Sequence, residues 1–337
     1  MEIRDVDRAD EAALREFWEV GKAADNAARP HDWWSPWEGA RVNYLSPRPG
    51  LRFEMLAAYE DGRTVGTASV HMPTMDNLHL GFVGIHVLPS HQRRGIGSAL
   101  LGRAEDLLRD AGRRVSMGDA YAPVGEDSAS LRFAHRLGYT DAIEDGMKVV
   151  DLVETEPTWA AIEEETRARR GDYRLVSWTR EVPDELLPGF IHLNEAFNDE
   201  APTGEMELER EVWDEARVRG GEKQSREVGR HVLAVAALAP DQGGGAPPEM
   251  VGVTEIVVSE HAPHRGFQSG TLVLPAHRGH ALGLAMKVAN HRQLRRLFPE
   301  CRLLLTGNAG VNVAMNAVND RLGFREVERC IEVQKEL

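Results

Sequence analysis

The sequence predicts an α/β fold with a mixed α+β sheet, built as two tandem domains that are each a mostly antiparallel sheet flanked by helices. Two observations predict this organisation. A strand–turn–helix segment occurs twice, as GIHVLPSHQRRGIGSALL at 84–101 and as GTLVLPAHRGHALGLAMK at 270–287. A second segment also recurs, because DSASLRFAHRLGY at 127–139 matches NVAMNAVNDRLGF at 312–324 with an offset of 185 positions. Separate segments that repeat in the same order indicate duplication of a whole domain.

Hydrophobic periodicity and turn residues divide the first half into regular elements. Alternating apolar residues bounded by turns, such as the Asp61-Gly62 turn, predict strands. Apolar residues three to four positions apart predict helices. The expected elements are a short strand after Met1, a helix at 9–24, strands at 53–59, 64–72 and 80–87, a helix at 98–111, a strand at 113–120, a helix at 127–137 and a strand at 148–153.

The same order restarts after a charged, helix-prone connector at 154–171. This arrangement predicts an N-terminal domain at 1–153 and a C-terminal domain at 172–337. The Gly- and Pro-rich tract DQGGGAPP is expected to be a long hairpin loop, because the repeat continues through it. The expected elements are a strand at 173–179, helices at 185–198 and 207–219, strands at 232–238 and 251–258, a helix ending at Leu297, a strand at 302–306, a helix at 311–322 and a last strand near Ile331.

An irregular aromatic segment at 29–39 interrupts the first half. Its tryptophans are Trp33, Trp34 and Trp37. Indole rings recognise aromatic or cationic groups, and they also bury large apolar areas. The sequence leaves two interpretations open, namely that these rings bind an acceptor or that they pack between the halves.

Composition narrows the classes of partner. The chain of 337 residues has a net charge of −14, and this acidity argues against a broad nucleic-acid interface, which needs a positive face. No apolar run approaches the roughly 20 residues that span a bilayer, so no membrane partner is expected. We expect Cys301 and Cys330 to be reduced core residues of a cytoplasmic protein that is a monomer or a homodimer.

Each copy of the first repeated segment ends its strand at a proline and opens a helix through small residues. These are Gly95 and Gly97 in the first copy and Ala281 and Gly283 in the second. Such a turn directs free backbone N–H groups outward at a helix N-terminus, where the helix dipole also favours negative charge. We therefore expect two phosphate-binding turns. Neither copy has the GxxxxGK motif of a P-loop, and the spacing differs from the GxGxxG fingerprint of dinucleotide-binding folds.

The pattern Gln/Arg-x-x-Gly-x-Gly after Val-x-Pro resembles the GNAT superfamily of acyl-CoA N-acyltransferases. The segment at 92–97 fits the pattern throughout, whereas the segment at 278–283 departs from it at Ala281. Two alternatives follow: the extra methyl group crowds the diphosphate, or it is harmless if the local φ is negative. The LGY and LGF motifs that end the second repeated segment also match. The resemblance covers nearly the whole chain, once per half, and the tandem architecture is similar to the actinobacterial two-domain acyltransferases that include mycothiol synthase.

The resemblance implies that the fourth and fifth strands of each half splay apart, with acetyl-CoA (coenzyme A) as co-substrate in the gap and with no metal ion. It implies that strand backbone pairs with the pantetheine arm and that the turn amides hold the diphosphate. The expected coenzyme A-binding residues are Ile85, His86, Val87, Gln92, Arg93, Arg94, Gly95, Ile96, Gly97 and Ser98 in the first half, and Leu272, Val273, Leu274, Arg278, Gly279, His280, Ala281, Leu282, Gly283, Asn312 and Asn319 in the second.

Transfer of an acetyl group to an amine needs a proton acceptor for the amine, a donor for the oxyanion and an acid for the leaving thiolate. The resemblance implies a tyrosine acid four residues before the glycine of the LGY or LGF motif, where this chain has Ala134 and Asn319. Asparagine donates a hydrogen bond to a thiolate but cannot protonate it. The candidates for the base are His86 on its strand and Glu255 acting through water. A structural role is the alternative for each.

Four asparagines, Asn308, Asn312, Asn316 and Asn319, follow one another at spacings of 4, 4 and 3. This spacing predicts that the last three lie along one face of a helix with Asn308 near its start. Because asparagine is a mediocre helix former, we interpret the stripe as a polar face that lines the second cleft. The alternative is a helix cap followed by a solvated face.

The second half therefore combines the altered turn with the more polar cleft, and we expect it to carry the reaction. The first half is expected to bind coenzyme A or to stabilise the pair. The expected activity is acetyl transfer from acetyl-CoA to the primary amine of a small molecule or a peptide by direct attack on the thioester. The alternatives are a non-catalytic acyl-CoA-binding module and a transferase that uses aminoacyl-tRNA, which the acidic composition disfavours.

Overall fold

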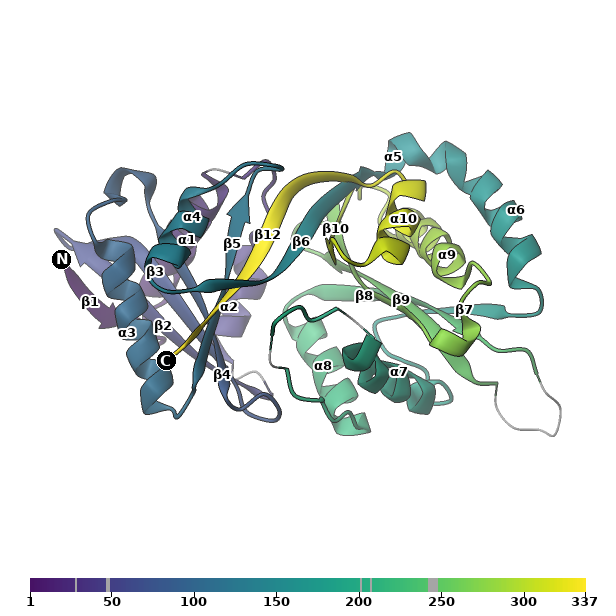
Figure 1. Ribbon diagram of the computed structural model, residues 1–337, viewed down its shortest axis with the longest axis horizontal. Coiled ribbons are helices and arrows are strands. Elements are labelled where there is room, and N and C mark those ends of the chain that lie inside the picture. Colours follow the sequence, from purple (N-terminus) through teal and green to yellow (C-terminus); the bar gives the residue numbers. More distant parts are fainter. Residues whose placement is uncertain (28, 47–48, 201, 207, 242–247) are drawn as a thin grey trace. The chain divides into compact units, whose positions relative to one another are not determined.

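The computed structural model describes residues 1–27, 29–46, 49–200, 202–206, 208–241 and 248–337 (Figure 1). Most of the predicted DQGGGAPP loop therefore lies outside the described residues. The chain divides into two packing units. Unit 1 comprises Met1–Gly146, Thr203–Glu209 and Val327–Leu337, and unit 2 comprises Met147–Pro202 and Arg210–Glu326.

Unit 1 is built on a sheet whose strands follow the spatial order β1-β2-β3-β4-β5-β12. Its strands are β1 (Glu2–Asp5), β2 (Leu51–Glu60), β3 (Arg63–Pro73), β4 (Leu80–Val87), β5 (Val115–Ala122) and β12 (Arg325–Glu336). Neighbours are antiparallel except for β4 and β5, which are parallel. The last strand of the chain thus closes the sheet of unit 1, where Arg329 pairs with Ala122 and Glu336 with Val115 (Figure 1, yellow).

Helices cover both faces of the unit 1 sheet. Alternate residues of β2 pack on opposite sides, because Met55 joins the cluster that contains Leu14 and Phe17 of α1 whereas Leu56 joins the cluster that contains Leu100 of α3. The helix α1 begins at a good N-cap, since the Asp10 side chain accepts hydrogen bonds from two backbone N–H groups. The helices are α1 (Glu11–Asn26) and α2 (Trp37–Leu45) on one face and α3 (Ile96–Asp110) and α4 (Ala129–Arg136) on the other.

Unit 2 repeats this plan with the order β11-β10-β9-β8-β7, and β6 lies next to β11. The pair β10–β11 is parallel and the pairs β10–β9, β9–β8 and β8–β7 are antiparallel. The strands are β6 (Thr140–Asp151), β7 (Arg174–Thr179), β8 (Arg230–Leu238), β9 (Met250–Ser259), β10 (Arg265–Val273) and β11 (Leu303–Ala309).

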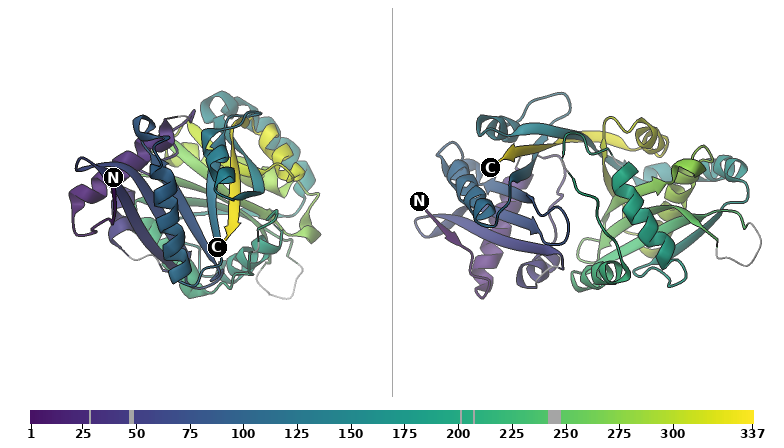
Figure 2. Two further views of the ribbon diagram at one scale, coloured as in Figure 1. Left: turned by 60° about the vertical axis from the view of Figure 1, so that its left-hand side comes forward. Right: turned by 60° about the horizontal axis from the view of Figure 1, so that its bottom comes forward.

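The helices of unit 2 also lie on two faces (Figures 1 and 2). The core around Leu193 and Val218 covers one face, and the core around Trp159 and Val288 covers the other. The first face carries α7 (Leu187–Glu200) and α8 (Glu215–Glu227), and the second carries α6 (Trp159–Arg170) and α9 (Leu282–Leu297), with α5 (Leu152–Thr155) and α10 (Val313–Arg321) beyond.

The predicted helix at 207–219 is wrong in position. The structure has no helix before Asp214 in that segment among the residues it describes, and α8 begins there because the Asp214 side chain caps the backbone N–H of Arg217. The expected connector at 154–171 is largely helical. Its Trp159 is completely buried, so this segment belongs to the core of unit 2.

The closing strands are exchanged between the two halves of the sequence. Unit 1 ends on β12, which comes from the second half, and the β6 residues after Gly146 belong to unit 2 beside β11. The packing units therefore differ from the ranges 1–153 and 172–337 at these strands. Those ranges describe the duplicated sequence, and the boundaries of independently folding domains stay a prediction.

The parallel strand pair of each unit separates after a short contact. In unit 1, pairing between β4 and β5 ends at Phe82 and Met117, and in unit 2, pairing between β10 and β11 ends at Phe267 and Leu305. The remaining residues of these strands diverge toward their carboxyl ends. The repeated turns follow β4 and β10 directly, so each lies beside such a divergence.

Candidate active site

The two repeated turns share one backbone conformation. In each, a 3₁₀ turn follows the strand, and two residues with positive φ then precede the helix. These residues are Arg93 (63°) and Gly95 (85°) in unit 1 and Gly279 (89°) and Ala281 (56°) in unit 2. Neither α3 nor α9 has a side-chain cap. The first N–H groups of both helices are therefore left to bind an external acceptor such as a phosphate.

The backbone conformation at Ala281 is unfavourable for alanine. A negative φ was the condition for a harmless alanine, but Ala281 lies in the left-handed region with φ of 56°. For a residue with a Cβ atom this conformation is strained. The equivalent Gly95 has the same conformation without that strain, and a Cβ atom there would meet no neighbouring atom within 4 Å.

A side chain in each turn ties it to the preceding strand. Gln92 Nε2 donates to the Val87 carbonyl oxygen at 3.1 Å, and Arg278 Nε donates to the Val273 carbonyl oxygen at 3.1 Å. Different side chains thus make the same contact in the two units. This explains why the sequence pattern accepts either glutamine or arginine at this position.

A β-bulge in β10 distinguishes this strand from β4, its counterpart in unit 1. In β9 and β10, Thr254 pairs with Thr271 and Ile256 with Gln268, so Glu255 faces both Ser269 and Gly270. In unit 1 the pairing of β3 with β4 is continuous. The extra residue leaves backbone groups of the bulge outside the strand ladder. Free N–H groups at such a point are suitable donors to an oxyanion.

A cavity of about 220 Å³ lies where β10 and β11 diverge. It adjoins the bulge on one side and the start of α10 on another, and all its lining residues belong to unit 2. The lining residues are Phe197, Glu200, Phe267, Gln268, Ser269, Gly270, Thr271, Leu272, Lys287, Gly307, Asn308, Asn312 and Met315.

Polar side chains connect the wall of this cavity to the core. Lys287 Nζ donates to Asn319 Oδ1 at 2.7 Å, and Asn319 Nδ2 donates to Asn308 Oδ1 at 2.5 Å. Lys287 is 1% exposed and Asn319 is fully buried. Burial, and secondarily the positive charge of Lys148, lowers the pKa of Lys287 to about 7.

The asparagine stripe differs from its prediction in detail. Asn308 lies on β11 rather than near the start of a helix, and Asn312 is the N-cap of α10, whose side chain accepts from the Met315 N–H. Asn316 accepts a hydrogen bond from Lys148 Nζ at 2.9 Å. Asn308 and Asn312 line the cavity. Asn316 and Asn319 thus lie on α10 with Asn312 at its N-cap, whereas Asn308 belongs to a strand.

Glu255 lies on the opposite side of the bulge from the polar network. Its neighbours Val253 and Ile256 pack on the α7 side and the α9 side of the sheet, so alternation directs Glu255 toward α7 and α8. Burial, and secondarily the charge of Glu222, raises the pKa of Glu255 to about 7. A carboxyl group that titrates near neutrality is suited to general base catalysis.

In unit 1 a buried ion network crosses the diverging ends of β4 and β5. The Arg29 side chain bonds to Asp25 at 3.0 Å and to Glu328 at 2.7 Å, and its guanidinium lies 3.6 Å from the centroid of the Tyr121 ring. The Arg29, Asp25 and Glu328 side chains are at most 10% exposed. A guanidinium of the chain itself therefore holds the acidic and aromatic groups of this region.

His86, a candidate base, belongs to the same network. Its Nε2 lies 3.8 Å from Asp25, and its ring packs edge-on against Trp34. Burial lowers the pKa of His86, and Asp25 opposes that effect. Trp34 also packs over Gly21, and Trp37 contacts Trp18, so these two rings pack within unit 1.

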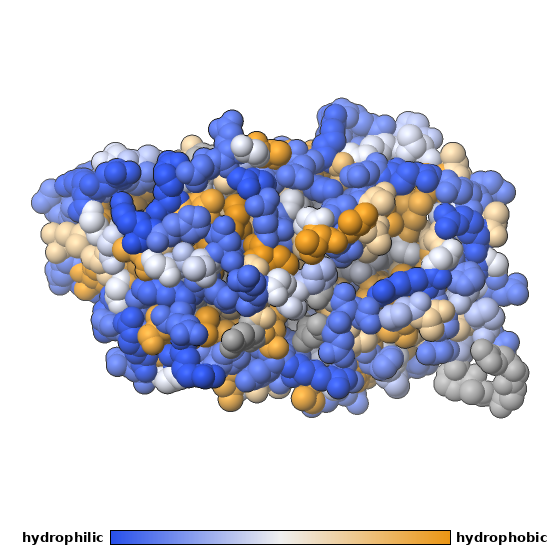
Figure 3. Space-filling model, viewed as in Figure 1, coloured by the Kyte–Doolittle hydropathy of each residue, from blue (hydrophilic) through white to orange (hydrophobic). Residues whose placement is uncertain are grey.

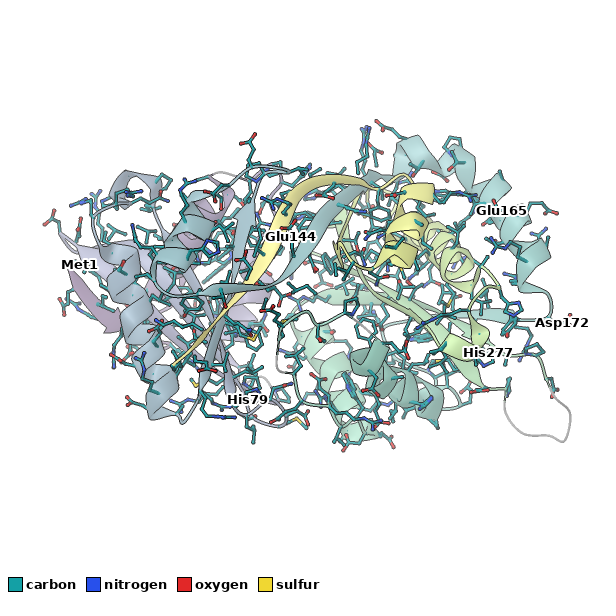
Figure 4. The ribbon with its side chains drawn as sticks, in the orientation of Figure 1. Met1, His79, Glu144, Glu165, Asp172 and His277 are labelled. Carbon is teal, nitrogen blue, oxygen red and sulfur yellow. The ribbon has the colours of Figure 1, made fainter. Side chains whose placement is uncertain are left out.

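The remaining predicted coenzyme A-binding residues lie on the ends of β4 and β10, in the turns that follow them, or in the first turns of α3 and α9. Ile85 and Val87 pack on the α3 side of β4, and Leu272 lines the cavity. Glu200, which lines the cavity, bonds to Arg278 at 2.5 Å. Tyr173 anchors the same turn through a 2.8 Å hydrogen bond between its hydroxyl and Nδ1 of His277, which is labelled in Figure 4.

Sequence reasoning missed Lys287 and the Arg29 network. The sequence does contain a signal for Lys287. Leu284, Lys287, His291 and Leu294 follow the 3-4-3 spacing of one helix face, so two titratable residues stand within an apolar stripe. No comparable signal marks the Arg29 network, because Asp25 is close to Arg29 in the sequence but Tyr121 and Glu328 lie far away, on β5 and β12.

Four further observations bear on the class of site. Among the described residues, no group of three His, Cys, Asp or Glu side chains is arranged to hold a metal ion. No helix in the described part of the chain is long and apolar enough to cross a membrane. Both cysteines are buried and free. The face drawn in Figure 3 is largely hydrophilic, consistent with the net charge of −14.

Comparisons with known proteins agree with this geometry. The model of the acetyltransferase (GNAT) family matches residues 12–139. The L-methionine sulfoximine/L-methionine sulfone acetyltransferase of Salmonella typhimurium is 30% identical over 142 residues, which is 42% of this chain and 80% of that protein.

Two solved structures show the same fold over the whole chain. A tandem GNAT protein from the clavulanic acid biosynthesis pathway has a TM-score of 0.81 at 24% identity, covering 99% of this chain and 98% of that one. A GCN5-related N-acetyltransferase from Sphaerobacter thermophilus has a TM-score of 0.66 at 16% identity, covering 99% and 95%. Taken with the sequence relationships, these similarities establish that the chain belongs to the GNAT acetyltransferase family, as a tandem-domain N-acetyltransferase.

Proposed function

We propose that this N-acetyltransferase transfers the acetyl group of acetyl-CoA to the primary amine of a small molecule or a peptide, and that the reaction takes place in unit 2. The observation that carries the proposal is the cavity between β10 and β11, with a bulge in its wall and the uncapped α9 turn at the end of the same strand. Unit 1 has the turn, but its β4 pairs with β3 without a bulge, and a buried ion network lies across the diverging ends of β4 and β5.

The residues present fit coenzyme A. The amides that follow Gly279 and Ala281 face outward at a helix N-terminus, which suits a diphosphate. The diverging backbone from Thr271 to Val273 suits the amide groups of the pantetheine arm. A volume of about 220 Å³ is too small for the whole molecule and is in keeping with its thioester end.

Two groups of unit 2 suit the chemistry of direct attack. Acetyl-CoA supplies an activated acyl group when bound. The bulge at Ser269 and Gly270 offers backbone N–H groups for the oxyanion of the tetrahedral intermediate. Glu255 takes a proton from the attacking amine through a water molecule, for which its raised pKa is appropriate.

The acceptor site lies on the α7 side of the cavity. Phe197 and Phe267 are exposed at its rim, at 36% and 41%, and Glu200 adds a carboxylate. This combination favours an amine that carries an apolar side chain. Because a related enzyme is named for L-methionine sulfoximine and L-methionine sulfone, these two amines are the first acceptors to try.

The test measures thiol release from acetyl-CoA with a panel of amines, using the full chain and three matched variants. Gly283→Glu places a carboxylate in the unit 2 turn, Gly97→Glu does so in unit 1, and Gly220→Glu is a control in α8, where a Cβ atom meets nothing within 4 Å. We expect Gly283→Glu to abolish turnover and the control to retain it.

Three outcomes would contradict the proposal. Loss of turnover with Gly97→Glu alone would move the reaction to unit 1. Calorimetric binding of acetyl-CoA without thiol release across the panel would favour the non-catalytic module. The absence of any binding would remove the basis of both functions.

A further inference from the structure

The side chain of Lys287 is the least expected feature of the unit 2 cavity. It projects from α9 into the core, is 1% exposed, and lines the cavity together with Asn308. Among the residues that the structure describes, no carboxylate lies within ion-pair distance of its Nζ. A lysine that is buried without a carboxylate is costly to a fold, and such groups are concentrated at functional sites.

The contacts of Lys287 fix the position of its amino group. Nζ donates to Asn319 Oδ1 at 2.7 Å, and Asn319 is itself held by Asn308 on β11. The Phe324 ring lies 5.8 Å from Nζ on another side. One donor position of Nζ is therefore occupied by Asn319, and the geometry leaves others for a group in the cavity.

The internal repeat provides a matched comparison. Lys287 corresponds to Leu101 of unit 1, and Asn319 corresponds to Ala134. Leu101 and Ala134 are 5% and 8% exposed and share one apolar cluster. Unit 1 thus has two apolar residues where unit 2 has a lysine and its hydrogen-bond acceptor.

We propose that Lys287 is the acid that protonates the leaving thiolate of coenzyme A in unit 2, with Asn319 as the residue that positions Nζ. This inference rests on the proposed function. The C–N bond to the amine forms as the C–S bond breaks, and the ammonium group of Lys287 gives a proton to the sulfur. The attacking amine gives one proton to Glu255 through water and the sulfur takes one from Lys287, so the two transfers cancel. Exchange with solvent then restores the carboxylate of Glu255 and the ammonium group of Lys287.

The charged groups around Lys287 are consistent with this role. Lys148 on β6 donates to Asn316 of α10, and Asp320 on α10 lies 3.5 Å from Lys148 rather than beside Lys287. His291, one turn further along α9, is buried, and its pKa is lowered to about 3 by burial and by Lys287, so it stays neutral. Glu200 at the rim bonds to Arg278. Lys287 itself has a pKa lowered to about 7, so both protonation states are available at neutral pH.

The test combines kinetics with a direct titration of the lysine. Lys287→Met keeps the length of the side chain without the charge, Lys287→Gln is a second variant in case the first fails to fold, and Lys223→Met removes an exposed lysine of α8 as the control. We expect kcat to fall on the order of 100-fold or more in the Lys287 variants. We expect the Kd for acetyl-CoA to change by less than about threefold, and the alkaline limb of the pH profile to disappear. The control should match the unaltered chain.

Nuclear magnetic resonance of the full chain with lysine labelled at Cε gives a readout that needs no turnover. The resonance missing from Lys287→Met should titrate near pH 7. Titration of that resonance near pH 10, an unchanged pH profile in the variants, or acetylation of Lys287 itself would overturn the inference. If Gly283→Glu abolishes turnover while Lys287→Met retains it, this inference fails and the proposed function stands. If the unaltered chain neither binds nor turns over acetyl-CoA, the proposed function has failed first.

Discussion

Nζ of Lys287 and Oδ1 of Asn319 are joined by a 2.7 Å hydrogen bond inside the core of unit 2. The duplicated positions in unit 1, Leu101 and Ala134, pack together as apolar residues. Both residues of the pair are therefore polar in unit 2 and apolar in unit 1. A buried amino group needs an acceptor, and a buried asparagine needs donors, so each polar residue supplies a hydrogen-bond partner to the other.

The first prediction concerns Arg29, which holds the unit 1 ion network together. Arg29→Met would leave Asp25 and Glu328 buried without their cation, and removal of one partner of a buried ion pair costs about 3–5 kcal/mol. We expect the free energy of unfolding to fall by that order in chemical denaturation. Thiol release, measured below the unfolding transition, should be retained because we propose that the reaction takes place in unit 2. The control is Arg4→Met, whose partner is exposed. Equal stability of Arg29→Met and the control would contradict the ion network.

The second prediction uses the two left-handed turn residues as a reciprocal pair. The left-handed conformation costs a residue with a Cβ atom roughly 1–2 kcal/mol, and the greater freedom of glycine in the unfolded chain offsets about 0.4–1 kcal/mol of that. Ala281→Gly should therefore stabilise the chain by about 0.5–1 kcal/mol, and Gly95→Ala should destabilise it by a similar amount. Nothing lies within 4 Å of a Cβ atom at Gly95, so packing does not contribute to the effect of Gly95→Ala. Thermal unfolding of both variants would measure the effect, and shifts of the same sign would refute the argument.

The third prediction concerns the acid limb of the pH profile. A base must be deprotonated to act, and the pKa of Glu255 is raised to about 7 by burial and by Glu222. Turnover should therefore fall as the pH decreases through about 7. Glu255→Gln should lower kcat by about 100-fold or more and remove this limb. Glu260→Gln, in the exposed loop after β9, is the matched control and should leave the profile unchanged. A persistent acid limb in Glu255→Gln would assign the base elsewhere.

The fold was largely predictable because its signals are local or repeated. The apolar run of β4 was predicted with the bounds that the structure has, and the turns at Gly95 and Ala281 were placed by their repetition alone. The helix at 207–219 was misplaced because its charged sequence has no apolar stripe strong enough to fix the start. The side-chain cap at Asp214 fixes where the helix starts. The exchange of β6 and β12 could not be predicted from the sequence, because the hydrophobic pattern of each strand is compatible with either sheet.

The site was less predictable for a physical reason. The asparagines were noticed as a helix face, but their roles depend on Lys287 and Lys148, which approach from α9 and β6. Such contacts between distant segments are fixed by tertiary packing, not by spacing along one element. The bulge at Ser269 and Gly270 likewise shows in the register of β9 against β10, and neither strand reveals it alone.

The last prediction separates function from stability at Lys287. Its pKa is lowered from the ordinary value of 10.5 to about 7, first by burial. Between these pH values the unfolded chain binds a proton that the folded chain does not, so stability should rise with pH across this window. At neutral pH the charged form is destabilised by about 4–5 kcal/mol, whereas the hydrogen bond to Asn319 contributes about 1–3 kcal/mol.

Lys287→Met should therefore stabilise the chain at pH 7 although it impairs turnover, and the gain in stability should shrink toward pH 10. Chemical denaturation at pH 7, 8.5 and 10, with Lys223→Met as the control, measures this. A variant that is both inactive and less stable at pH 7 would show that Lys287 supports the core, since a residue retained for proton transfer is expected to lower stability where it is charged.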